Sequence, residues 1–519
     1  MRDSPPARSP LPAALEAIVG PGAMRRGTPE RYAYAADLWP KNQLWKMQGE
    51  PARYAPDAVV QPGSEAEVLA ICAAAAERSV PVIPYGAGSG VCGGTVPIRG
   101  GVIMDVRRLR NIGQVDPLDM TVTVDAGVIG MHLEETLAER GYTLGHFPSS
   151  ILCSTVGGWV AARSAGQFSS KYGKIEDMVV GVRVALPSGR IVETHESQPD
   201  DLTALYVGSE GTLGTIVSAT LRVHPAPETQ VFRGFRFRTL DDAVRGIRLL
   251  MQSGKEPCLV RLYDPVDTVL HRSKDPATVV KDDSESPSFL HGLLDSALGR
   301  GAKKAGIALA LGNPSLLNRL ANTVAAECLL IVGFEGATAV VDRDAPAAWR
   351  LLEDAGGVDG GEGPGRQWLE KRYAVSFKQS ALYAAGAFVD TLEVGCTWSR
   401  LLPVYHAVRN ALAPHALIMA HMSHAYREGC SIYFTFAAHR RDPKALERHY
   451  DRVIEDALTA VIREGGSIAH HHGIGLAKRD HMAREHGAGL RLLYAAKDAI
   501  DPFGLMNPGK VLPDRAVTQ

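Results

Sequence analysis

The feature that most limits how this chain can fold is a glycine-rich segment at residues 84–94, Pro-Tyr-Gly-Ala-Gly-Ser-Gly-Val-Cys-Gly-Gly. Residues 88–93 match the G-x-G-x-x-G pattern of a dinucleotide-binding turn, in which a helix follows the glycines and its first amides receive the pyrophosphate. Here Pro97 and two more glycines follow at once, before an apolar run at residues 102–106. No helix can begin in that interval, so the segment is predicted to be a loop between two strands and not a Rossmann turn.

Because this loop has almost no side chains, its successive backbone N–H groups can turn toward phosphate oxygens as a nest. A merely tight connection between strands is the alternative interpretation. Two further segments share the character of the loop. Residues 148–159 place small hydroxyl residues before a helix of small residues, which suits the close approach of a flat ligand, and residues 210–216 are similar beside a strand. Three glycine-bearing loops of this kind are more than the reversal of the chain at turns would require.

The composition favours small-molecule chemistry. The chain has 519 residues, enough for two or three domains, and 56 Lys and Arg residues against 57 Asp and Glu residues give a net charge of −1. This balance supplies no basic field for nucleic acid. The 7 cysteines are scattered and never form a C-x-x-C motif, which argues against a disulfide framework or a thiolate zinc site. We find no signal-peptide-like start and no apolar run long enough to span a membrane, so we expect a cytoplasmic protein.

Short apolar runs alternate with turns and helical patterns along the chain, which is typical of an α+β fold. We expect a leader with a short helix at residues 1–54, an α+β domain at 55–226, a second α+β domain at 227–455 and a C-terminal segment at 456–519. The expected elements are helices at 13–19, 65–78, 241–251, 443–465 and 490–500, strands at 80–84, 121–125, 231–237, 329–334 and 431–436, and a hairpin at 179–192.

Residues 281–322 break this pattern with a Ser/Asp/Pro-rich stretch, followed by a Gly/Lys/Ala-rich one at 299–312. One interpretation is a mobile loop without a specific function, and the other is a lid over an apolar substrate. A basic-then-apolar stretch this short would give only weak, reversible membrane attachment. Peripheral membrane contact and a homodimer both stay open.

The sequence His470-His471-His472-Gly-Ile-Gly follows a glycine pair and a short apolar run. Three adjacent side chains cannot all face one way on an extended segment, so at most two should address a single site. A solvated surface cluster is one interpretation. The flanking glycines and Ile468 favour a buried turn instead, and because imidazole titrates near neutrality, the turn is a candidate for proton handling.

A second candidate group begins at His421 and His424 and continues into the strand at 431–436. Period-two alternation puts Ser431, Tyr433 and Thr435 on one face of this strand and three apolar residues on the other. A polar face with a tyrosine in an otherwise apolar strand predicts a site, while a core tyrosine with a satisfied hydroxyl is the alternative.

Together, the loops resemble the flavin-binding domain of the vanillyl-alcohol-oxidase/PCMH superfamily, which holds FAD between two α+β subdomains. The resemblance covers roughly residues 55–225 and the C-terminus. It implies that the first domain, completed by the C-terminal segment, holds the flavin, and that the middle domain caps the ring and selects the substrate. Many members tether FAD through a histidine in the first loop, where this chain has Ser89 and Gly90, so we expect non-covalent FAD. The implied cofactor-binding residues are Pro84, Gly86, Ala87, Gly88, Ser89, Gly90, Val91, Gly93, Pro148, Ser149, Ser154, Thr155, Gly157, Gly158, Ala161, Ser164, Glu210, Gly211, Thr212, Gly214 and Ile216.

Within the superfamily, Tyr433 and the histidine triplet resemble the alkyldihydroxyacetonephosphate synthase family, with further support from residues 390–393 and Trp398. Residues 501–510 support the superfamily only. The resemblance implies exchange of the acyl group of acyl-dihydroxyacetone phosphate for a fatty alcohol in ether lipid synthesis. A proton leaves the carbon next to the carbonyl, the carboxylate departs, and the flavin N5 holds the carbon skeleton as an adduct without net reduction. Tyr433, His470, His471 and His472 are implied as catalytic. Because a phenol titrates near 10, Tyr433 would need a partner, and His471 is the first candidate.

One departure concerns the substrate phosphate. The position at which that family places its phosphate-binding arginine is Gln379 here, with Lys378 beside it and Arg372 a little earlier. A lysine can hold a phosphate as a point charge, but the bidentate fork of an arginine is lost.

Two other functions are weighed against this one. An FAD-dependent 2-hydroxy-acid dehydrogenase of the D-lactate/glycolate type shares the flavin loops, but usually carries a Glu-His-Gly turn and a Gly-Asp-Gly-Asn-x-His motif that bind a divalent metal. Here a histidine replaces that glutamate and the second motif is missing, so we predict no metal, although His421, His424 and one of the triplet could still offer imidazole ligands to zinc or manganese. A non-catalytic flavin-binding or sensor protein is the third possibility, and it leaves Tyr433 and the histidines without a purpose.

Overall fold

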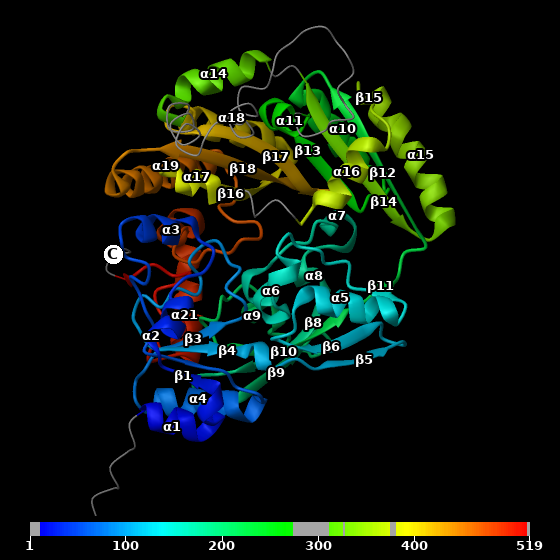
Figure 1. The fold of residues 1–519 in the computed structure, drawn as a ribbon. Helices are drawn as coiled ribbons and strands as arrows, with labels where there is room; N and C mark the ends of the chain where they lie inside the picture. Colours follow the sequence, from blue (N-terminus) through cyan, green and yellow to red (C-terminus); the bar gives the residue numbers. More distant parts are fainter. Residues whose placement is uncertain (1–10, 273–310, 325–326, 374–379, 516–519) are drawn as a thin grey trace, which may run out of the picture.

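The computed structural model describes residues 11–272, 311–324, 327–373 and 380–515, which form an α+β fold. Three larger sheets and one two-stranded ribbon carry the described strands (Figure 1). The two sheets of the first 222 residues lie below, and a seven-stranded sheet lies above them in this view. The α+β class expected from the sequence is confirmed.

The glycine-rich loop leaves the first of these sheets, which has the strand order β1-β2-β4-β3. Its strands are β1 (Met24–Arg25), β2 (Ala58–Val60), β4 (Val102–Asp105) and β3 (Val82–Tyr85). β2, β3 and β4 are parallel and almost wholly buried, which fits their continuous apolar runs. Residues 86–101 therefore connect two neighbouring parallel strands without a helix, as the sequence predicts.

The second sheet is antiparallel throughout. Its strands, in spatial order, are β5 (Ile112–Asp116), β6 (Thr121–Asp125), β10 (Thr215–Arg222), β8 (Val179–Ala185) and β9 (Ile191–His195). The ribbon pairs β7 (Tyr142–Thr143) with β11 (His224–Pro225). The helices of this part are α1 (Leu11–Val19), α2 (Thr28–Ala33), α3 (Pro40–Met47), α4 (Glu65–Ala76), α5 (Gly130–Glu139), α6 (Val156–Ala162), α7 (Ser169–Tyr172), α8 (Ile175–Met178) and α9 (Thr203–Tyr206).

The third sheet is antiparallel and has seven strands. In spatial order they are β15 (Val358–Asp359), β12 (Thr229–Phe237), β14 (Cys328–Gly336), β13 (Leu259–Tyr263), β17 (Leu417–Ala425), β18 (Gly429–His439) and β16 (Ala387–Thr397). Its helices are α10 (Leu240–Gln252), α11 (Pro265–Arg272), α14 (Pro314–Val324), α15 (Thr338–Asp354), α16 (Gly363–Lys371), α17 (Ser380–Ala384), α18 (Trp398–Leu412) and α19 (Pro443–Arg463).

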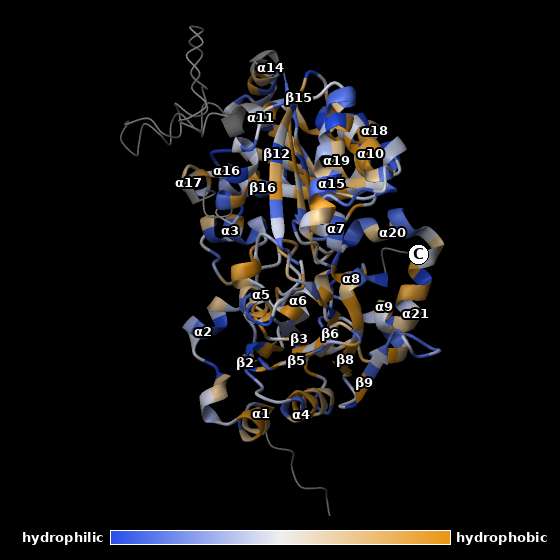
Figure 2. Ribbon diagram, turned by 90° about the vertical axis from the view of Figure 1, so that its right-hand side faces the viewer, coloured by the Kyte–Doolittle hydropathy of each residue, from blue (hydrophilic) through white to orange (hydrophobic). Residues whose placement is uncertain are grey.

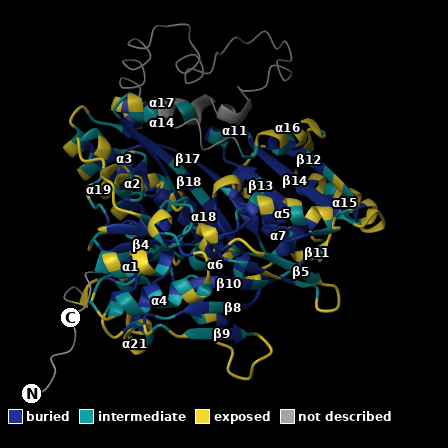
Figure 3. Ribbon diagram, turned by 60° about the horizontal axis from the view of Figure 1, so that its bottom comes forward, coloured by how far each residue is buried: buried dark blue, intermediate teal, exposed yellow. Residues whose placement is uncertain are grey.

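One face of this sheet is an apolar core. Helices α10, α15, α18 and α19 cover it, and Figure 2 shows them on one side of the strands. The pattern of α10 explains how it packs: Thr239 caps its first turn, two aspartates follow there, and Ala243, Ile247 and Leu250 recur at helical spacing and are buried. The opposite face of the sheet meets α7 and the sheets below it. Figure 3 shows the buried residues concentrated in the strands and the exposed ones in the outer helices and loops.

The C-terminal part of the chain returns to the glycine-rich loop. Beyond α19, orange to red in Figure 1, it forms α20 (Met482–His486) and α21 (Leu490–Ile500) and then runs beside β3. There, the Val82 N–H donates to Leu505 O at 2.9 Å, and the Asn507 N–H donates to Val82 O at 2.8 Å. The Asn507 side chain donates to the carbonyls of Gly94 at 2.8 Å and Glu210 at 2.7 Å. Two of the three glycine-bearing loops are thus joined by one C-terminal side chain.

Most expected elements are present with small differences in their ends. The strand at 121–125 and the helix at 490–500 have the predicted bounds. The strand expected at 431–436 extends over 429–439. α19 runs from 443 to 463, across the expected boundary at 455. Residues 281–310, the greater part of the segment expected to be a loop or lid, lie outside the described residues. No helix in the described ranges is both long and apolar enough to cross a membrane.

Candidate active site

Tyr433 and the histidine triplet meet at the polar face of the seven-stranded sheet. The phenol oxygen of Tyr433 lies 3.1 Å from His472 Nε2, and the Thr391 hydroxyl donates to the phenol oxygen at 3.2 Å. The alternation predicted for β18 is confirmed, because Ile432, Phe434 and Phe436 lie in the apolar core on the other face. The phenol partner is therefore His472 and not His471, the first candidate from the sequence.

The rings of the triplet divide between two neighbours. The ring centroids of His471 and His472 lie 6.0 and 5.2 Å from that of Tyr433, whereas the His470 ring stacks against His424 at 5.5 Å. His472 is the imidazole that hydrogen-bonds the phenol, and the His471 ring is nearer to His424, at 4.7 Å, than to Tyr433. Each of the three residues keeps some exposed surface.

Glu393 holds the backbone of the triplet. Its carboxylate is fully buried on β16, directly opposite Tyr433 in the strand register. Oε2 accepts the N–H groups of His470 and of His471, the latter at 3.1 Å, and Oε1 accepts that of His472 at 2.9 Å and the Lys478 ammonium at 2.8 Å. Four donors therefore fill the acceptor positions of a single carboxylate. This arrangement fixes the backbone from which the three imidazole side chains extend.

A second carboxylate holds the other end of the turn. Glu210, from the third glycine-bearing loop, accepts the N–H groups of Ile474 and Gly475. Gly475 has φ +51°, and a Cβ there would lie 2.1 Å from Cys92 O, so only glycine fits where the turn crosses the first loop. Glu210 was predicted to contact the cofactor, and in the structure its carboxylate connects the flavin loops to the histidine turn.

Burial and charge set the ionisation of this site. Burial disfavours the charged form of Glu393, but Lys478, with His471 and His472, holds the pKa of that carboxyl well below its usual value. Burial also raises the pKa of Tyr433 above 10 and lowers the pKa of His472 to about 4, against the opposing charge of Glu393. At neutral pH, the phenol and the imidazole are thus both neutral, above a buried ion pair.

Two further histidines from β17 complete the cluster. The His421 ring stacks on Tyr433 with centroids 4.7 Å apart and a 15° tilt, and its Nε2 lies 3.0 Å from an Arg261 Nη2. His424 has φ +55° at a bulge, a strained conformation for a residue with a side chain, and its Nδ1 lies 2.7 Å from the Ser169 hydroxyl. Ser169 begins α7, so the lower domain fixes a histidine of the upper sheet.

Glu393, His470 and His471 are close enough for a metal group, with one ligand atom of each within 4.8 Å of the others. The carboxylate is already saturated by four donors, so a metal there would have to displace Lys478 or a backbone amide. His421 and His424, the imidazoles considered from the sequence, are engaged by Arg261 and Ser169. The donor set fits proton chemistry better than metal binding.

The glycine-rich loop fits the diphosphate of FAD. In the described part of the chain, no backbone N–H from Ala87 to Gly94 donates a hydrogen bond to the protein. The loop carbonyls are used, since the N–H groups of Leu38 and Leu476 donate to Gly90 O and Cys92 O. Gly88 has φ +67°, the left-handed backbone that a nest contains. A loop held by its carbonyls with eight unused donors is suited to an anionic ligand.

The other predicted cofactor residues lie around α6. Thr155 caps this helix by accepting the Gly158 N–H at 3.2 Å, and the Ser154 hydroxyl accepts the Trp159 indole N–H at 2.8 Å. A Cβ on Gly157 would lie 2.6 Å from Ala126, so close packing of the helix on its sheet explains that glycine. Ala161 O accepts the Glu210 N–H at 2.9 Å, which places two of the predicted loops in contact.

The structure describes one of the three residues predicted to bind the substrate phosphate. Lys378 and Gln379 lie outside the described residues, and Arg372 lies just after α16, among aromatic rings. Sequence reasoning missed Arg261, Lys478 and Ser169, which no local motif marks. Thr391 could have been found, because it is two residues from Glu393 and therefore shares its strand face.

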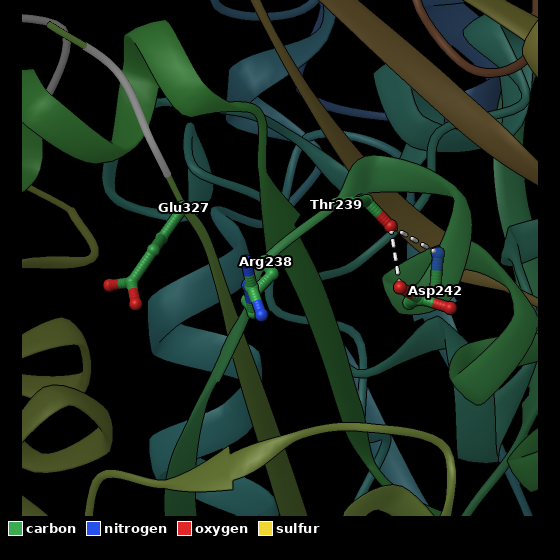
Figure 4. A pocket seen from close by; sticks show the side chains of 4 residues that line it. All are labelled: Arg238, Thr239, Asp242 and Glu327. Carbon is green, nitrogen blue, oxygen red and sulfur yellow. Dashed lines mark hydrogen bonds between the residues drawn. The ribbon is translucent and has the colours of Figure 1, made fainter.

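Cavities also occur away from this cluster. One of about 520 Å³ is lined by Arg238, Thr239, Asp242 and Glu327 at the start of α10, where Thr239 bonds Asp242 (Figure 4). β12, which leads into it, is four strands away from β18 across the sheet. It has none of the predicted site residues and is not part of the candidate active site.

Comparisons with known proteins agree with this geometry. A family model described as an FAD binding domain matches residues 56–195, and one described as the C-terminal domain of FAD linked oxidases matches residues 226–511. The chain is 30% identical over 501 residues to the alkyldihydroxyacetonephosphate synthase of Trypanosoma brucei brucei, over 93% of this chain and 78% of the relative. It is 25% identical over 504 residues to the glycolate oxidase subunit GlcD of Bacillus subtilis (strain 168), over 95% of both.

A solved structure of an alkyldihydroxyacetonephosphate synthase superposes with a TM-score of 0.76 at 27% identity, over 98% of this chain and 87% of that one. The second family model alone matches more than half of the chain, and the free amides of the glycine-rich loop suit the cofactor that both models name. The chain therefore belongs to the FAD-linked oxidases of the PCMH superfamily, together with alkyldihydroxyacetonephosphate synthase, and it is an FAD-dependent enzyme.

Proposed function

We propose that this enzyme exchanges the acyl group of acyl-dihydroxyacetone phosphate for an alkyl group from a fatty alcohol, as the name of its trypanosomal relative indicates for that protein. The observation that carries the proposal is the contact of the Tyr433 phenol with His472 Nε2, above a triplet whose backbone Glu393 fixes. This reaction needs a base for a C–H next to a carbonyl and an acid for the departing group, and a neutral phenol–imidazole pair can serve both needs.

The residues that would hold FAD are the free amides of 87–94, the small residues before and within α6, and the loop at 210–216. When bound, FAD supplies an electrophilic ring for the carbon skeleton without net oxidation. Because Ser89 and Gly90 occupy the positions at which a tethering histidine occurs in the superfamily, we propose that the flavin is bound non-covalently.

Proton transfer would begin with the phenol. His472 is neutral at pH 7 because burial lowers its pKa to about 4, so its Nε2 lone pair can accept a hydrogen bond from the phenol. Burial raises the pKa of Tyr433, which disfavours a free phenolate, so the phenol passes its proton to Nε2 as its oxygen removes the substrate proton, and the Thr391 hydroxyl at 3.2 Å donates a hydrogen bond to that oxygen. The buried charge of Glu393 opposes the effect of burial on His472 and favours the imidazolium that forms. Return of the proton through the same pair supplies the acid.

The second candidate is oxidation of a 2-hydroxy acid, favoured by the match to the glycolate oxidase subunit over the whole chain. For that reaction, Arg261 beside His421 could receive a carboxylate, and the phenol–histidine pair could accept the hydroxyl proton. The saturated Glu393 counts against a metal-assisted version of this chemistry.

Two assays on the FAD-loaded protein separate the candidates. Incubation with acyl-dihydroxyacetone phosphate and a long-chain alcohol should release fatty acid only when the alcohol is present, and the oxidised flavin band should persist. Anaerobic mixing with D-lactate or glycolate should leave that band unbleached. Bleaching by a hydroxy acid without alcohol-dependent release would contradict the synthase proposal and support the oxidase.

A further inference from the structure

Arg372 is held in an aromatic frame between the two halves of the molecule. Its guanidinium carbon lies 5.1 Å from the ring centroid of Phe147 and 5.2 Å from that of Phe168, both in the lower domain. On its own side, it lies 5.9 Å from Trp368 and 4.7 Å from Tyr373. Four rings thus orient a planar cation, which fixes its fork before any ligand arrives.

The polar atoms of this frame are left unsatisfied. By distance and angle, Arg372 Nη1, Gln167 Oε1 and the Tyr373 hydroxyl are buried without a hydrogen-bond partner among the described residues, while Arg372 and Tyr373 are close enough to interact electrostatically. Arg372 also forms no ion pair with any described carboxylate, whereas Arg107, Arg183 and Arg409 each have one. A buried donor without an acceptor is costly, so three unsatisfied atoms in one cluster indicate a ligand that completes them.

The frame adjoins the reaction centre through Phe168 and Gln167. Phe168 directly precedes Ser169, whose hydroxyl contacts His424 Nδ1, and the His424 ring is 4.7 Å from that of His471. The Gln167 side-chain amide donates to Ser149, in a predicted flavin loop, and to Arg372 O at 3.4 Å. The Arg372 frame therefore lies between a flavin loop and the histidine cluster.

We propose that Arg372, within this frame and beside Gln167 and Tyr373, binds the phosphate group of the substrate. The inference rests on the synthase function proposed above and supplies the anion site that Gln379 cannot. A phosphate monoester fits the mixed set of partners, because its oxygens accept from Arg372 and Tyr373. Near neutrality, it also retains a fraction of P–OH that can donate to the Gln167 carbonyl oxygen. A carboxylate has no such donor.

The nearby charge is compatible with an anion. Glu134 is the carboxyl that acts electrostatically on Tyr373. Burial raises the pKa of Glu134 to about 7, so its negative charge is reduced at neutral pH. The hydroxyl of Thr143 and the N–H of His146 occupy its oxygens at 2.9 and 3.3 Å.

Calorimetric titration of the FAD-loaded protein with glycerol 3-phosphate, inorganic phosphate and glycerate tests this site without requiring turnover. Arg372→Gln should weaken glycerol 3-phosphate binding about 10- to 100-fold, the effect of losing charge-assisted hydrogen bonds, and Arg372→Lys should weaken it less. Arg366→Gln, on the exposed side of α16 where it pairs with Glu362, is the matched control and should change nothing. If Arg372→Gln does not fold, Gln167→Leu should still weaken glycerol 3-phosphate binding and spare glycerate binding.

Unchanged binding of glycerol 3-phosphate in Arg372→Gln, or a loss of FAD with no change in that binding, would overturn the proposal. Tighter binding of glycerate than of glycerol 3-phosphate would identify a carboxylate site and also overturn it. If the exchange assay is negative while Arg372→Gln weakens phosphate-ester binding, only the synthase function fails. If exchange occurs and the KM for acyl-dihydroxyacetone phosphate is unaltered in Arg372→Gln, only the phosphate site fails.

Discussion

The two faces of the seven-stranded sheet are made by the same strands and have opposite contents. On β18, Ile432, Phe434 and Phe436 are fully buried beneath α18 and α19, where they pack in the apolar core. On the other face, Tyr433 meets imidazoles, Thr391 and the charged Glu393. Period-two alternation thus lets one strand support the fold with one set of side chains and the chemistry with the other, and the two sets should respond differently to mutation.

The polar face should be the more fragile where a charge is removed. Glu393→Gln keeps the shape of the side chain but leaves Lys478 buried, at 3% exposure, without its counter-charge. We expect a loss of about 3–5 kcal/mol in the free energy of unfolding, together with loss of turnover, because an NH2 donor replaces one of the two oxygens that accept the triplet amides. Denaturant unfolding and the exchange assay measure the two effects. Glu362→Gln, at an exposed ion pair, is the control and should change the stability by less than about 1 kcal/mol.

The apolar face should affect stability alone. Phe434→Ala removes a fully buried ring, and we expect it to lower the free energy of unfolding by about 3–5 kcal/mol. The rate per folded, FAD-loaded molecule should stay within a few-fold of the wild-type rate below the unfolding transition. A turnover loss as large as that of Glu393→Gln at unchanged FAD content would show that the faces are not separable.

Lowering the pH should reduce the stability of the protein through His472 on the polar face. The pKa of His472 is about 4 in the folded protein against an ordinary 6.5, so between these values the unfolded chain binds more protons than the folded one. Stability should therefore fall as the pH is lowered from about 6.5 toward 4, and the loss should be complete below 4. His472→Gln should show a shallower decline in thermal unfolding midpoint over this window. The same slope in both proteins would contradict the assignment.

The smallest effect is expected at Thr391. Thr391→Val keeps the shape and removes the hydroxyl that donates to the phenol oxygen. One such hydrogen bond is worth about 0.5–1.5 kcal/mol, so we expect kcat to fall by up to about tenfold with KM unchanged. Thr435→Val, on the same face and paired with Thr391 in the register, is the comparison variant and should leave kcat unchanged.

The sequence was informative wherever structure follows a local rule. The glycine-rich composition of residues 84–94 predicted a loop with free amides, and the alternation at 431–436 predicted a strand with a polar face. Both are present. It could not distinguish His472 from His471 as the phenol partner, because Glu393 and Glu210 fix the path of the turn from 79 and 264 residues away. Arg261 and Ser169 were missed for the same reason, since strand pairing and domain packing alone bring them to the site.

The central claim is that the Tyr433 phenol and the His472 imidazole form the proton-transfer pair. Its most direct test is steady-state exchange by Tyr433→Phe, with the FAD content measured from the absorbance of the same sample. We predict a fall in kcat of about 100- to 10,000-fold with full FAD content, while Tyr405→Phe, on the opposite face of the sheet, keeps its kcat. Wild-type turnover in Tyr433→Phe would contradict the account.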